Sequence, residues 1–461
     1  MTSVQLEQAL RITPPLMLAL SGAGGKTSIM MQLARQIPGP VVITSTTHLA
    51  YDQVRLADRH VIATQAKELS IQLADNSSGS WKVLAVTGAV RPDQRSGPLS
   101  MDMATVLQGW CRQHGYSLLV EADGSRRLPL KAPAAHEPVI PAWSDPVVVS
   151  AGLSGLEKTL SSDVVHRPEQ FARLSGLQLG NQITPEALGH VLAAAEGGKK
   201  GIPAGARCVA FLNHANDPSR QEDALVIAGM IRQDYDAVVI CAQDLSQENA
   251  DTPAYPVNIP LAVQRVIEPA AGIVLAAGGS SRYGQPKFLL PWQGQALIRS
   301  VVIKALESGL DQVIVVVGAV IEAVQAALSG LPVQFVINPD WQEGQSTSIR
   351  RGLELINPAC GAAVFLLADQ PFLSAELIRR LIERHQAGLP AILAPQVNGR
   401  RANPVLFDRR MFDELRSVHG DVGGRALFQR YGVEYLDWPD ERLLLDIDTP
   451  QDYERSIELS S

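Results

Sequence analysis

Two glycine-rich loops, each between an apolar strand-like run and a helix-forming run, constrain the fold of this 461-residue chain most strongly. The first, SGAGGKT at residues 21–27, follows the apolar run 16–20 and precedes SIMMQLARQI. The second, AGGSSRYGQPK at 277–287, follows the apolar run 272–276. A buried strand that leads through a tight glycine turn into a helix is the building unit of α/β proteins. We therefore expect two α/β units.

Further runs rich in Val, Ile and Leu extend this pattern along both halves of the chain. They lie at 41–45, 83–88, 117–123, 147–150 and 208–213 in the first half, and at 312–320, 333–338, 362–369 and 391–397 in the second. Continuous apolar strands separated by helical segments indicate parallel sheets covered on both faces. The proline-rich stretch QENADTPAYPVNIP suggests an exposed connector. We predict domains at 1–250 and 268–461, joined by a linker at 251–267.

Composition and charge exclude several classes of function. Lys plus Arg number 40 and Asp plus Glu number 47, giving a formal charge of −7, so nothing favours binding to nucleic acid or to an acidic membrane. No apolar run approaches the roughly 20 residues that span a bilayer, and the first residues lack the pattern of a signal peptide. The four cysteines are far apart in the sequence, which fits a reducing compartment. We expect a cytoplasmic protein with neither disulfides nor a cysteine zinc site.

The second loop has the residues that a triphosphate requires. Its glycines let backbone N–H groups approach phosphate oxygens, and Arg282 and Lys287 supply positive charge. The segment 275–287 resembles the LAAGxSxRMGxxKxLLP signature of the molybdenum cofactor nucleotidyltransferases (MocA type), within the glycosyltransferase-A-like nucleotidyltransferase superfamily. Five later segments resemble the same family in order, at 338–348, 368–371, 403–407, 420–425 and 446–450.

This resemblance implies a Rossmann-like nucleotidyltransferase domain with assigned roles. Arg282, Lys287 and Asp369 would be catalytic. The nucleotide would contact Leu275, Ala276, Ala277, Gly278, Gly279, Ser280, Ser281 and Lys287, the acceptor would contact Glu343, Ser346, Ser348, Asn403 and Asp421, and Mg²⁺ would bind Asp369 and Asp448, with Asp446 as the alternative. Mg²⁺ prefers a few carboxylates together with phosphate oxygens. The competing interpretation is that these aspartates cap the segments that follow them.

The LAAG loop start resembles that of the enzymes that use CTP. The resemblance implies transfer of CMP from CTP to molybdopterin with release of pyrophosphate, for delivery of the cofactor to an apo molybdenum hydroxylase. A methyl group beside the base discriminates against guanine by only a few kcal/mol. Two alternatives stay open: nucleotidyl transfer to a sugar or alditol phosphate, and a non-catalytic, nucleotide-gated carrier of the finished cofactor.

The first loop predicts a second phosphate site, of P-loop type. Gly22, Gly24, Gly25, Lys26, Thr27 and Ser28 form the short GxxGK[ST] pattern, which looks like that of Mur-type ligases. A helix N-terminus, a lysine and a hydroxyl suit a nucleotide with Mg²⁺, and Glu121 and Asp123 end a strand that can supply the metal carboxylate. Thr44–His48, Arg126, Arg127, Lys131 and His136 are further candidates for the same crevice, against the plain alternative of solvated loop residues.

Together with GAGGKTS, the segments ITSTTH, VEADGSRRLPLKAPAAHEPVIP and VHRPE resemble the selenium-dependent hydroxylase accessory proteins of YqeC type over most of residues 14–245. This implies an accessory role that uses a nucleoside triphosphate. The position that resembles a guanine-reading NKxD has Asn213–Asp217 without the lysine, so we expect ATP or another triphosphate rather than GTP. Three distant histidines, His48, His136 and His166, lack the spacing of zinc ligands.

Overall fold

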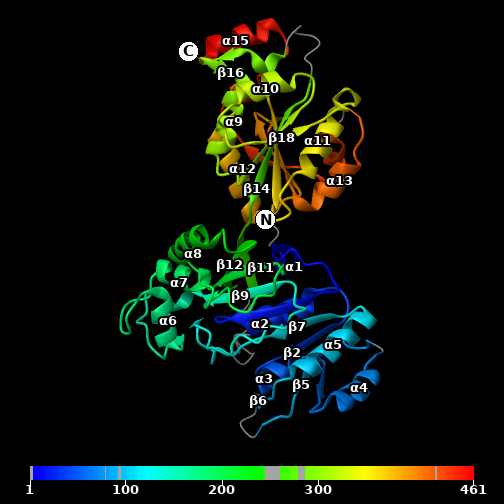
Figure 1. Ribbon diagram of the computed structural model, residues 1–461, viewed down its shortest axis with the longest axis vertical. Coiled ribbons are helices and arrows are strands. Elements are labelled where there is room, and N and C mark those ends of the chain that lie inside the picture. The colour runs from blue at the N-terminus through cyan, green and yellow to red at the C-terminus, as the bar shows by residue number, and fades with distance from the viewer. Residues whose placement is uncertain are drawn as a thin grey trace. The chain divides into compact units, whose positions relative to one another are not determined.

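A computed structural model describes residues 4–77, 79–91, 95–243, 260–278, 286–420 and 423–460. The chain divides into two compact units, Met1–Ile267 and Glu268–Ser461, and each is described by itself (Figure 1). Both are sheets with packed helices, so the predicted fold class of two α/β units is confirmed. The four cysteines are buried and free. In the described part of the chain no helix is long and apolar enough to cross a membrane.

The N-terminal unit is built on one nine-stranded sheet. In spatial order its strands are β13 (Leu261–Ile267), β12 (Ala237–Gln243), β11 (Cys208–Asn213), β9 (Val147–Gly152), β1 (Met17–Gly22), β7 (Ser117–Glu121), β2 (Val41–Ser45), β5 (Val83–Thr87) and β4 (Arg59–Ile62). Eight strands are parallel, as predicted. The sheet strands from β2 to β7 lie on one side of β1, and β9 and the later sheet strands lie on the other. The order in which strands are added to the sheet therefore reverses at β1. Open α/β sheets bind ligands at such a switch point.

Helices cover this sheet in two groups. Leu69, Leu107 and Cys111 pack on the half that contains β2, β5 and β7, and Phe171, Val191 and Ile227 pack on the half that contains β9, β11 and β12. The helices are α1 (Leu6–Ala9), α2 (Lys26–Gln36), α3 (Tyr51–Val54), α4 (Ala66–Ala74), α5 (Met101–His114), α6 (Pro168–Ser175), α7 (Pro185–Ala193) and α8 (Pro218–Ile231). Short strand pairs join β3 (Leu49–Ala50) to β6 (Arg95–Ser96) and β8 (Leu130–Lys131) to β10 (Val165–His166).

The described part of the expected linker is instead a strand. β13 pairs antiparallel with β12 along the edge of the N-terminal sheet, and Val4 bridges to Val263 on its other side. Leu261, Val263 and Val266 are buried. The prediction of a linker at 251–267 is therefore wrong for residues 261–267, because an alternating apolar pattern there covers the sheet edge. Residues 251–259 lie outside the described part.

The C-terminal unit contains a mixed sheet. Its strands follow the order β18 (Gln334–Ile337), β17 (Gln312–Val317), β14 (Ala270–Ala276), β19 (Ala362–Leu367), β22 (Val405–Asp408), β20 (Ile392–Val397) and β21 (Arg400–Arg401), with β23 (Glu434–Asp437) paired to β20. The first four are parallel, but β22 is antiparallel to both β19 and β20. The expectation of a fully parallel sheet is wrong in this half.

Alternating side chains divide the C-terminal core between the two faces of the sheet. Val274 and Val315 pack under α9 (Leu297–Glu307) and α12 (Ala375–Gly388), whereas Ile273 and Ile314 pack under α11 (Gln345–Glu354) and α13 (Phe412–Ser417). Burial on both faces explains why these strands are continuously apolar. The remaining helices are α10 (Ile321–Ala327), α14 (Phe428–Tyr431) and α15 (Pro450–Ser460), and a small hairpin joins β15 (Pro291–Trp292) to β16 (Gln295–Ala296).

A charge placed on the buried face of β13 tests whether this strand belongs to the N-terminal sheet. Val266 is 1% exposed, so Val266→Asp should lower the free energy of unfolding of this unit by about 3 kcal/mol, since a buried carboxylate lacks a partner there. Gln264→Asp, at a half-buried position of the same strand, is the matched control and should change it little. Equal, small effects of both variants in urea denaturation would instead indicate a linker.

Candidate functional site

The N-terminal phosphate loop joins β1 to α2 and can only be built from glycine at three positions. Gly22, Gly24 and Gly25 have φ values of +89°, +74° and +117°. A Cβ on Gly24 would lie 2.3 Å from the backbone N of Gly152, at the end of β9. Asn213, fully buried at the end of β11, donates from Nδ2 to the carbonyl oxygen of Gly24 at 3.0 Å. The loop is therefore held against the carboxyl ends of two neighbouring strands.

The first turn of α2 contains the predicted Lys26, Thr27 and Ser28. Thr27 Oγ1 lies 3.4 Å from Glu121 Oε2 and accepts a hydrogen bond from Gln53 Nε2 at 2.9 Å. The structure thus brings the loop together with the carboxylates predicted at the end of β7. Gln53, on α3, was not identified from the sequence, because no local pattern relates it to the loop.

A buried chain of alternating charges extends from the loop. Lys26 Nζ lies 3.2 Å from Asp123 Oδ1, 3.9 Å from Glu121 Oε1 and 2.6 Å from the carbonyl oxygen of Gly22. Lys131 Nζ lies 2.9 Å from Asp123 Oδ2 and 2.7 Å from Glu137 Oε2. Arg167 then donates two hydrogen bonds to Glu137, at 2.7 and 2.9 Å. Three cations thus balance three carboxylates.

Burial and charge set the protonation of this cluster. Burial raises the pKa of Glu121, an effect that the neighbouring Lys26 opposes. Burial also tends to raise the pKa of Glu137, but hydrogen bonds from Arg167 and Lys131 outweigh it and lower that pKa to about 2. His166 has a pKa lowered to about 4 by burial and by Arg167, so its imidazole is neutral at pH 7.

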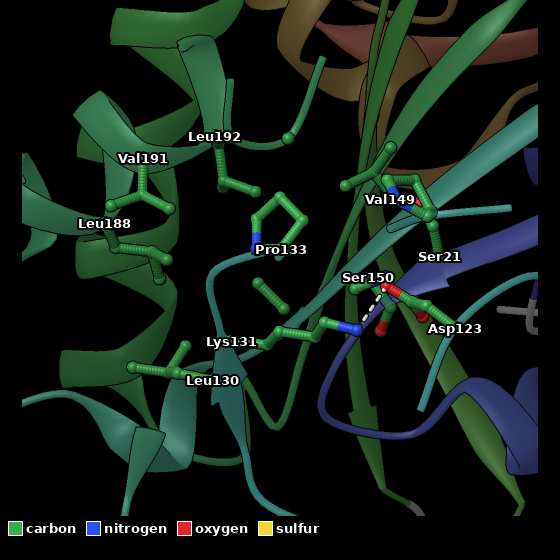
Figure 2. A pocket seen from close by; sticks show the side chains of 15 residues that line it. Ser21, Asp123, Leu130, Lys131, Pro133, Val149, Ser150, Leu188, Val191 and Leu192 are labelled. Carbon is green, nitrogen blue, oxygen red and sulfur yellow. Dashed lines mark hydrogen bonds and ion pairs between the residues drawn. The ribbon is translucent and has the colours of Figure 1, made fainter. Parts of the chain in front are cut away.

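A small cavity adjoins the loop at the switch point of the sheet. Its volume is about 30 Å³, and Figure 2 shows that its polar end is formed by Asp123 and Lys131, joined by an ion pair. Leu188, Val191 and Leu192 of α7 form its apolar side (Figure 2). The cavity also contacts Ser21, at the carboxyl end of β1. A cavity of this size holds about one water molecule, and it lies at the switch point where open α/β sheets bind their ligands.

Several other sequence candidates serve the backbone rather than this crevice. Thr44 Oγ1 donates to the carbonyl oxygen of Val86, and Thr46 Oγ1 to that of Val139. Lys131 does line the cavity, but its buried ammonium is engaged by Asp123, by Glu137 and by the carbonyl oxygen of Gly124 at 2.7 Å.

The segment Asn213–Asp217, at the position of a guanine-reading motif, also uses its side chains to bind backbone groups. Asn216 Oδ1 accepts from the backbone N of Gln243, and Asp217 caps α8 by accepting from the backbone N of Arg220. Arg126, Arg127 and His136 are exposed. Arg127 pairs with Asp52 at 2.7 Å.

The C-terminal loop begins where β14 ends, at Ala276. Ala277 is 4% exposed, and its carbonyl oxygen accepts from the backbone N of Ala319 at 3.1 Å. A Cβ on Gly318 would lie 2.7 Å from that same oxygen, so glycine is needed where the two loops meet. The structure places the predicted Leu275, Ala276, Ala277 and Gly278 at this strand end. Four further predicted residues, Gly279, Ser280, Ser281 and Arg282, lie outside the described residues.

Lys287 lies between the aspartates that the sequence assigned to the metal. Its Nζ is 2.5 Å from Asp369 Oδ2, after β19, and 2.7 Å from Asp448 Oδ1, before α15. Burial alone would lower the pKa of Lys287, but the two carboxylates raise it. Asp446 accepts from Gln370 Nε2 at 3.0 Å, and burial together with the Asp369 charge raises the pKa of its carboxyl.

The competing interpretation of these aspartates as caps is not supported. Ser374 caps α12, accepting from the backbone N of Leu377 at 3.1 Å. Asp452 accepts from the backbone N of Asp448 and of Thr449 before α15. The side chains of Asp369 and Asp448 are instead directed to Lys287.

The expected acceptor segment forms a hydrogen-bonded turn before α11. Asn338 is fully buried and donates to Thr347 Oγ1 at 2.8 Å and to Ser348 Oγ at 2.9 Å. Ser346 is also buried, and within the described residues its hydroxyl has no hydrogen-bond partner. Glu343 is exposed and Asn403 is half-buried. The predicted Asp421 lies outside the described residues.

The carboxylate pairs of the two units, Glu121 with Asp123 and Asp369 with Asp448, suit a Mg²⁺ ion that is bound together with a nucleotide. Among the described residues, no three His, Cys, Asp or Glu side chains converge as a metal cluster. Mg²⁺ bound with a nucleotide, however, takes only one or two carboxylates, the rest being phosphate oxygens and waters. Asp123 Oδ1 is buried and faces the ammonium of Lys26 at 3.2 Å, so a cation could bind there only in place of that ammonium. Glu121 and Asp123 fit such an ion in one unit, and Asp369 and Asp448 fit it in the other.

The fold and the two sites define a chain of two α/β domains, of which the C-terminal one is a nucleotidyltransferase domain. Residues 272–435 match the MobA-like NTP transferase domain, and residues 18–169 match the YqeC protein family. The chain belongs to both families, as a fusion of a YqeC domain with a MobA-like NTP transferase domain. The resemblance inferred from the sequence is thereby confirmed.

Individual relatives cover either half of the chain. The E. coli uncharacterized protein YqeC is 32% identical over 246 residues, 51% of this chain and 90% of that protein. Nicotine blue oxidoreductase of Paenarthrobacter nicotinovorans is 31% identical over 196 residues, 40% of this chain and 95% of that protein. A probable molybdenum cofactor guanylyltransferase of Bacillus cereus is 34% identical over 193 residues, 40% of this chain and 93% of that protein. The nucleotidyltransferase domain is thus related to molybdenum cofactor enzymes.

The Arg167–Glu137 pair predicts a pH-dependent part of the stability of the N-terminal unit. The pKa of Glu137 is about 2 in the folded protein, below its unfolded value. Its stabilising contribution is therefore complete above about pH 5 and is lost as the pH falls through about 2. Arg167→Met should lower the free energy of unfolding at pH 7 by about 2 kcal/mol, and this deficit should shrink between about pH 5 and pH 3.

Urea denaturation of both proteins across this pH range measures the effect. Arg173→Met removes an exposed arginine from α6, the helix that Arg167 precedes, and is the matched control with little expected effect. A deficit for Arg167→Met that is the same at every pH would contradict the assigned pKa of Glu137.

Proposed function

We propose that the C-terminal unit transfers CMP from CTP to the terminal phosphate of molybdopterin, releasing pyrophosphate. The observation that carries this proposal is the position of Lys287, between Asp369, which follows β19, and Asp448, which precedes α15. Together these residues provide a cation for phosphate oxygens and two carboxylates for Mg²⁺. The preference for CTP rests on the LAAG loop start at Leu275–Gly278.

In this reaction an oxygen of the acceptor phosphate attacks the α-phosphorus of CTP, and the bond from that phosphorus to the bridging oxygen breaks. The attacking oxygen is already anionic, so catalysis depends on alignment and neutralisation of charge rather than on a strong base. Lys287 and the loop N–H groups would hold the phosphates. Asp369 and Asp448 would hold Mg²⁺, which supplies charge neutralisation when bound. Glu343 and Ser346 would orient the acceptor.

The N-terminal unit would bind or hydrolyse ATP or another nucleoside triphosphate in the maturation of a molybdenum hydroxylase. Gly22, Gly24, Gly25 and Ser28 would surround the phosphates, and Lys26 would contact their oxygens. Thr27, Glu121 and Asp123 are close enough together to hold Mg²⁺ beside them. An apo hydroxylase would receive the product. Two domains on one chain also raise the local concentration of a shared intermediate.

Removal of Lys287 tests the proposed transferase. With CTP, Mg²⁺ and molybdopterin, Lys287→Ala should release pyrophosphate about 10²–10³-fold more slowly than the wild type, because a cation at the reacting phosphates is lost. Lys26→Ala alters the other unit and is the matched control. No release with CTP, GTP or ATP would favour the carrier function, and release only with a sugar or alditol phosphate would favour that acceptor.

Replacement of Ala277 tests the choice of nucleotide. Ala277→Gly removes one methyl group at the start of the loop, so the ratio of GTP to CTP in kcat/KM should rise by about tenfold. Ala276→Gly, at the neighbouring position at the end of β14, should leave this ratio unchanged. An unchanged ratio in Ala277→Gly would contradict the role of the LAAG sequence in specificity.

A further inference from the structure

The ammonium group of Lys26 is directed to the carboxylates rather than to the opening of the phosphate loop. Nζ is 3.2 Å from Asp123 Oδ1 and 3.9 Å from Glu121 Oε1. Its shortest contact, 2.6 Å, is with the carbonyl oxygen of Gly22, within the loop itself. The Lys26 side chain is only 3% exposed, and those of Asp123 and Glu121 are 1% and 9% exposed. These charges are largely removed from water.

Without Lys26, this cluster would carry an uncompensated negative charge. Among the described residues, the cations paired with Asp123 and Glu137 would then be Lys131 and Arg167. Lys131 is shared between two of the carboxylates, and Arg167 contacts Glu137. Buried carboxylates are costly without partners, so the position of the Lys26 ammonium requires a positive charge.

The same position has the ligands of a divalent cation. Asp123 Oδ1 is buried, and the Lys26 ammonium at 3.2 Å occupies the side on which a cation would bind. Thr27 Oγ1 lies near Glu121 Oε2, at 3.4 Å, on the helix turn that begins at the loop. Two carboxylates and a hydroxyl next to a phosphate loop are the oxygen donors that Mg²⁺ takes with a nucleotide. Lys26 and a cation therefore compete for one place.

We infer that Lys26 is an internal counter-ion that keeps a divalent cation out of the N-terminal site until nucleotide phosphates draw the lysine away, so that this site accepts the metal–nucleotide complex rather than either component alone. The inference rests on the proposed nucleotide binding by this unit. A free metal ion would be repelled by the ammonium group of Lys26. Free nucleotide, by taking Lys26, would leave Glu121 and Asp123 facing a triphosphate without compensation. The metal–nucleotide complex supplies a cation for Glu121 and Asp123 and phosphate oxygens for Lys26 at the same time.

The C-terminal unit has a similar but more exposed arrangement. Lys287 contacts Asp369 and Asp448, but the Asp448 side chain is 65% exposed and hence solvated. Water screens charge there, so competition between lysine and cation should be weaker than in the N-terminal unit. This second site also binds metal under the proposed function, and it must be silenced before the first can be measured.

Mn²⁺ titration of the full chain, followed by electron paramagnetic resonance, tests the inference. All proteins carry Asp369→Asn and Asp448→Asn to remove the C-terminal metal site. Without nucleotide, Lys26→Met should bind Mn²⁺ at least about tenfold more tightly than the parent, because a repelling charge a few ångströms away is gone. Lys26→Arg keeps the charge and should bind as weakly as the parent.

Two further variants keep the test decisive. Lys26→Gln is a second neutral replacement in case Lys26→Met does not fold, and circular dichroism checks folding. Adding Asp123→Asn to Lys26→Met should abolish the gain in Mn²⁺ affinity, which shows that the ion binds at this carboxylate. In the parent, Mn²⁺ should bind tightly only when a non-hydrolysable ATP analogue is present.

The possible failures are distinguishable. Equal Mn²⁺ affinity of Lys26→Met and the parent would overturn the counter-ion inference, as would a parent that binds the ATP analogue equally well with and without Mn²⁺. Absence of analogue binding by the parent under every condition would instead overturn the proposed nucleotide function of this unit, and the coupling with it.

Discussion

In both units the lysine of a glycine-rich loop pairs with two carboxylates, which are buried in the N-terminal unit and partly solvated in the C-terminal one. Lys26 contacts Asp123 and Glu121, and Lys287 contacts Asp369 and Asp448. The desolvation of a carboxylate is costly unless a partner compensates for it. The same lysines are the groups expected to hold nucleotide phosphates. The organisation of each site therefore depends on a charge that must change partners when a ligand binds.

The backbone at the start of each loop closely approaches a neighbouring segment. In the N-terminal unit, Gly24 approaches the end of β9 so closely that no side chain fits, and Asn213 holds the turn from β11. In the C-terminal unit, Gly318 approaches the carbonyl oxygen of Ala277 in a comparable way. Both loops lie at the carboxyl edge of parallel strands, where ligand sites form. Two unrelated sheets thus reach a similar arrangement of loop, lysine and carboxylates.

Local patterns predicted the strands, both loops and the strand-end aspartates, because these depend on apolar runs and glycine turns. The strand β13 was missed because the prolines before it outweighed the apolar residues Leu261, Val263 and Val266, whose alternation is interrupted by a β-bulge in the pairing with β12. The contacts of Lys131 with Asp123 and Glu137 were missed because they depend on how segments fold back on each other. No spacing in the sequence encodes that arrangement. The sequence also could not decide whether the aspartates near Lys287 cap the segments that follow them. The positions of the neighbouring side chains decided it.

A crystal structure of the full chain with Mn²⁺ and a non-hydrolysable ATP analogue would show which partner Lys26 takes when both ligands are bound. We expect an anomalous Mn²⁺ peak between Glu121 and Asp123, with Lys26 Nζ moved from Asp123 to a phosphate oxygen. This expectation would be contradicted by a bound nucleotide with Lys26 still paired to Asp123, or by Mn²⁺ between the carboxylates while the lysine keeps its present contacts.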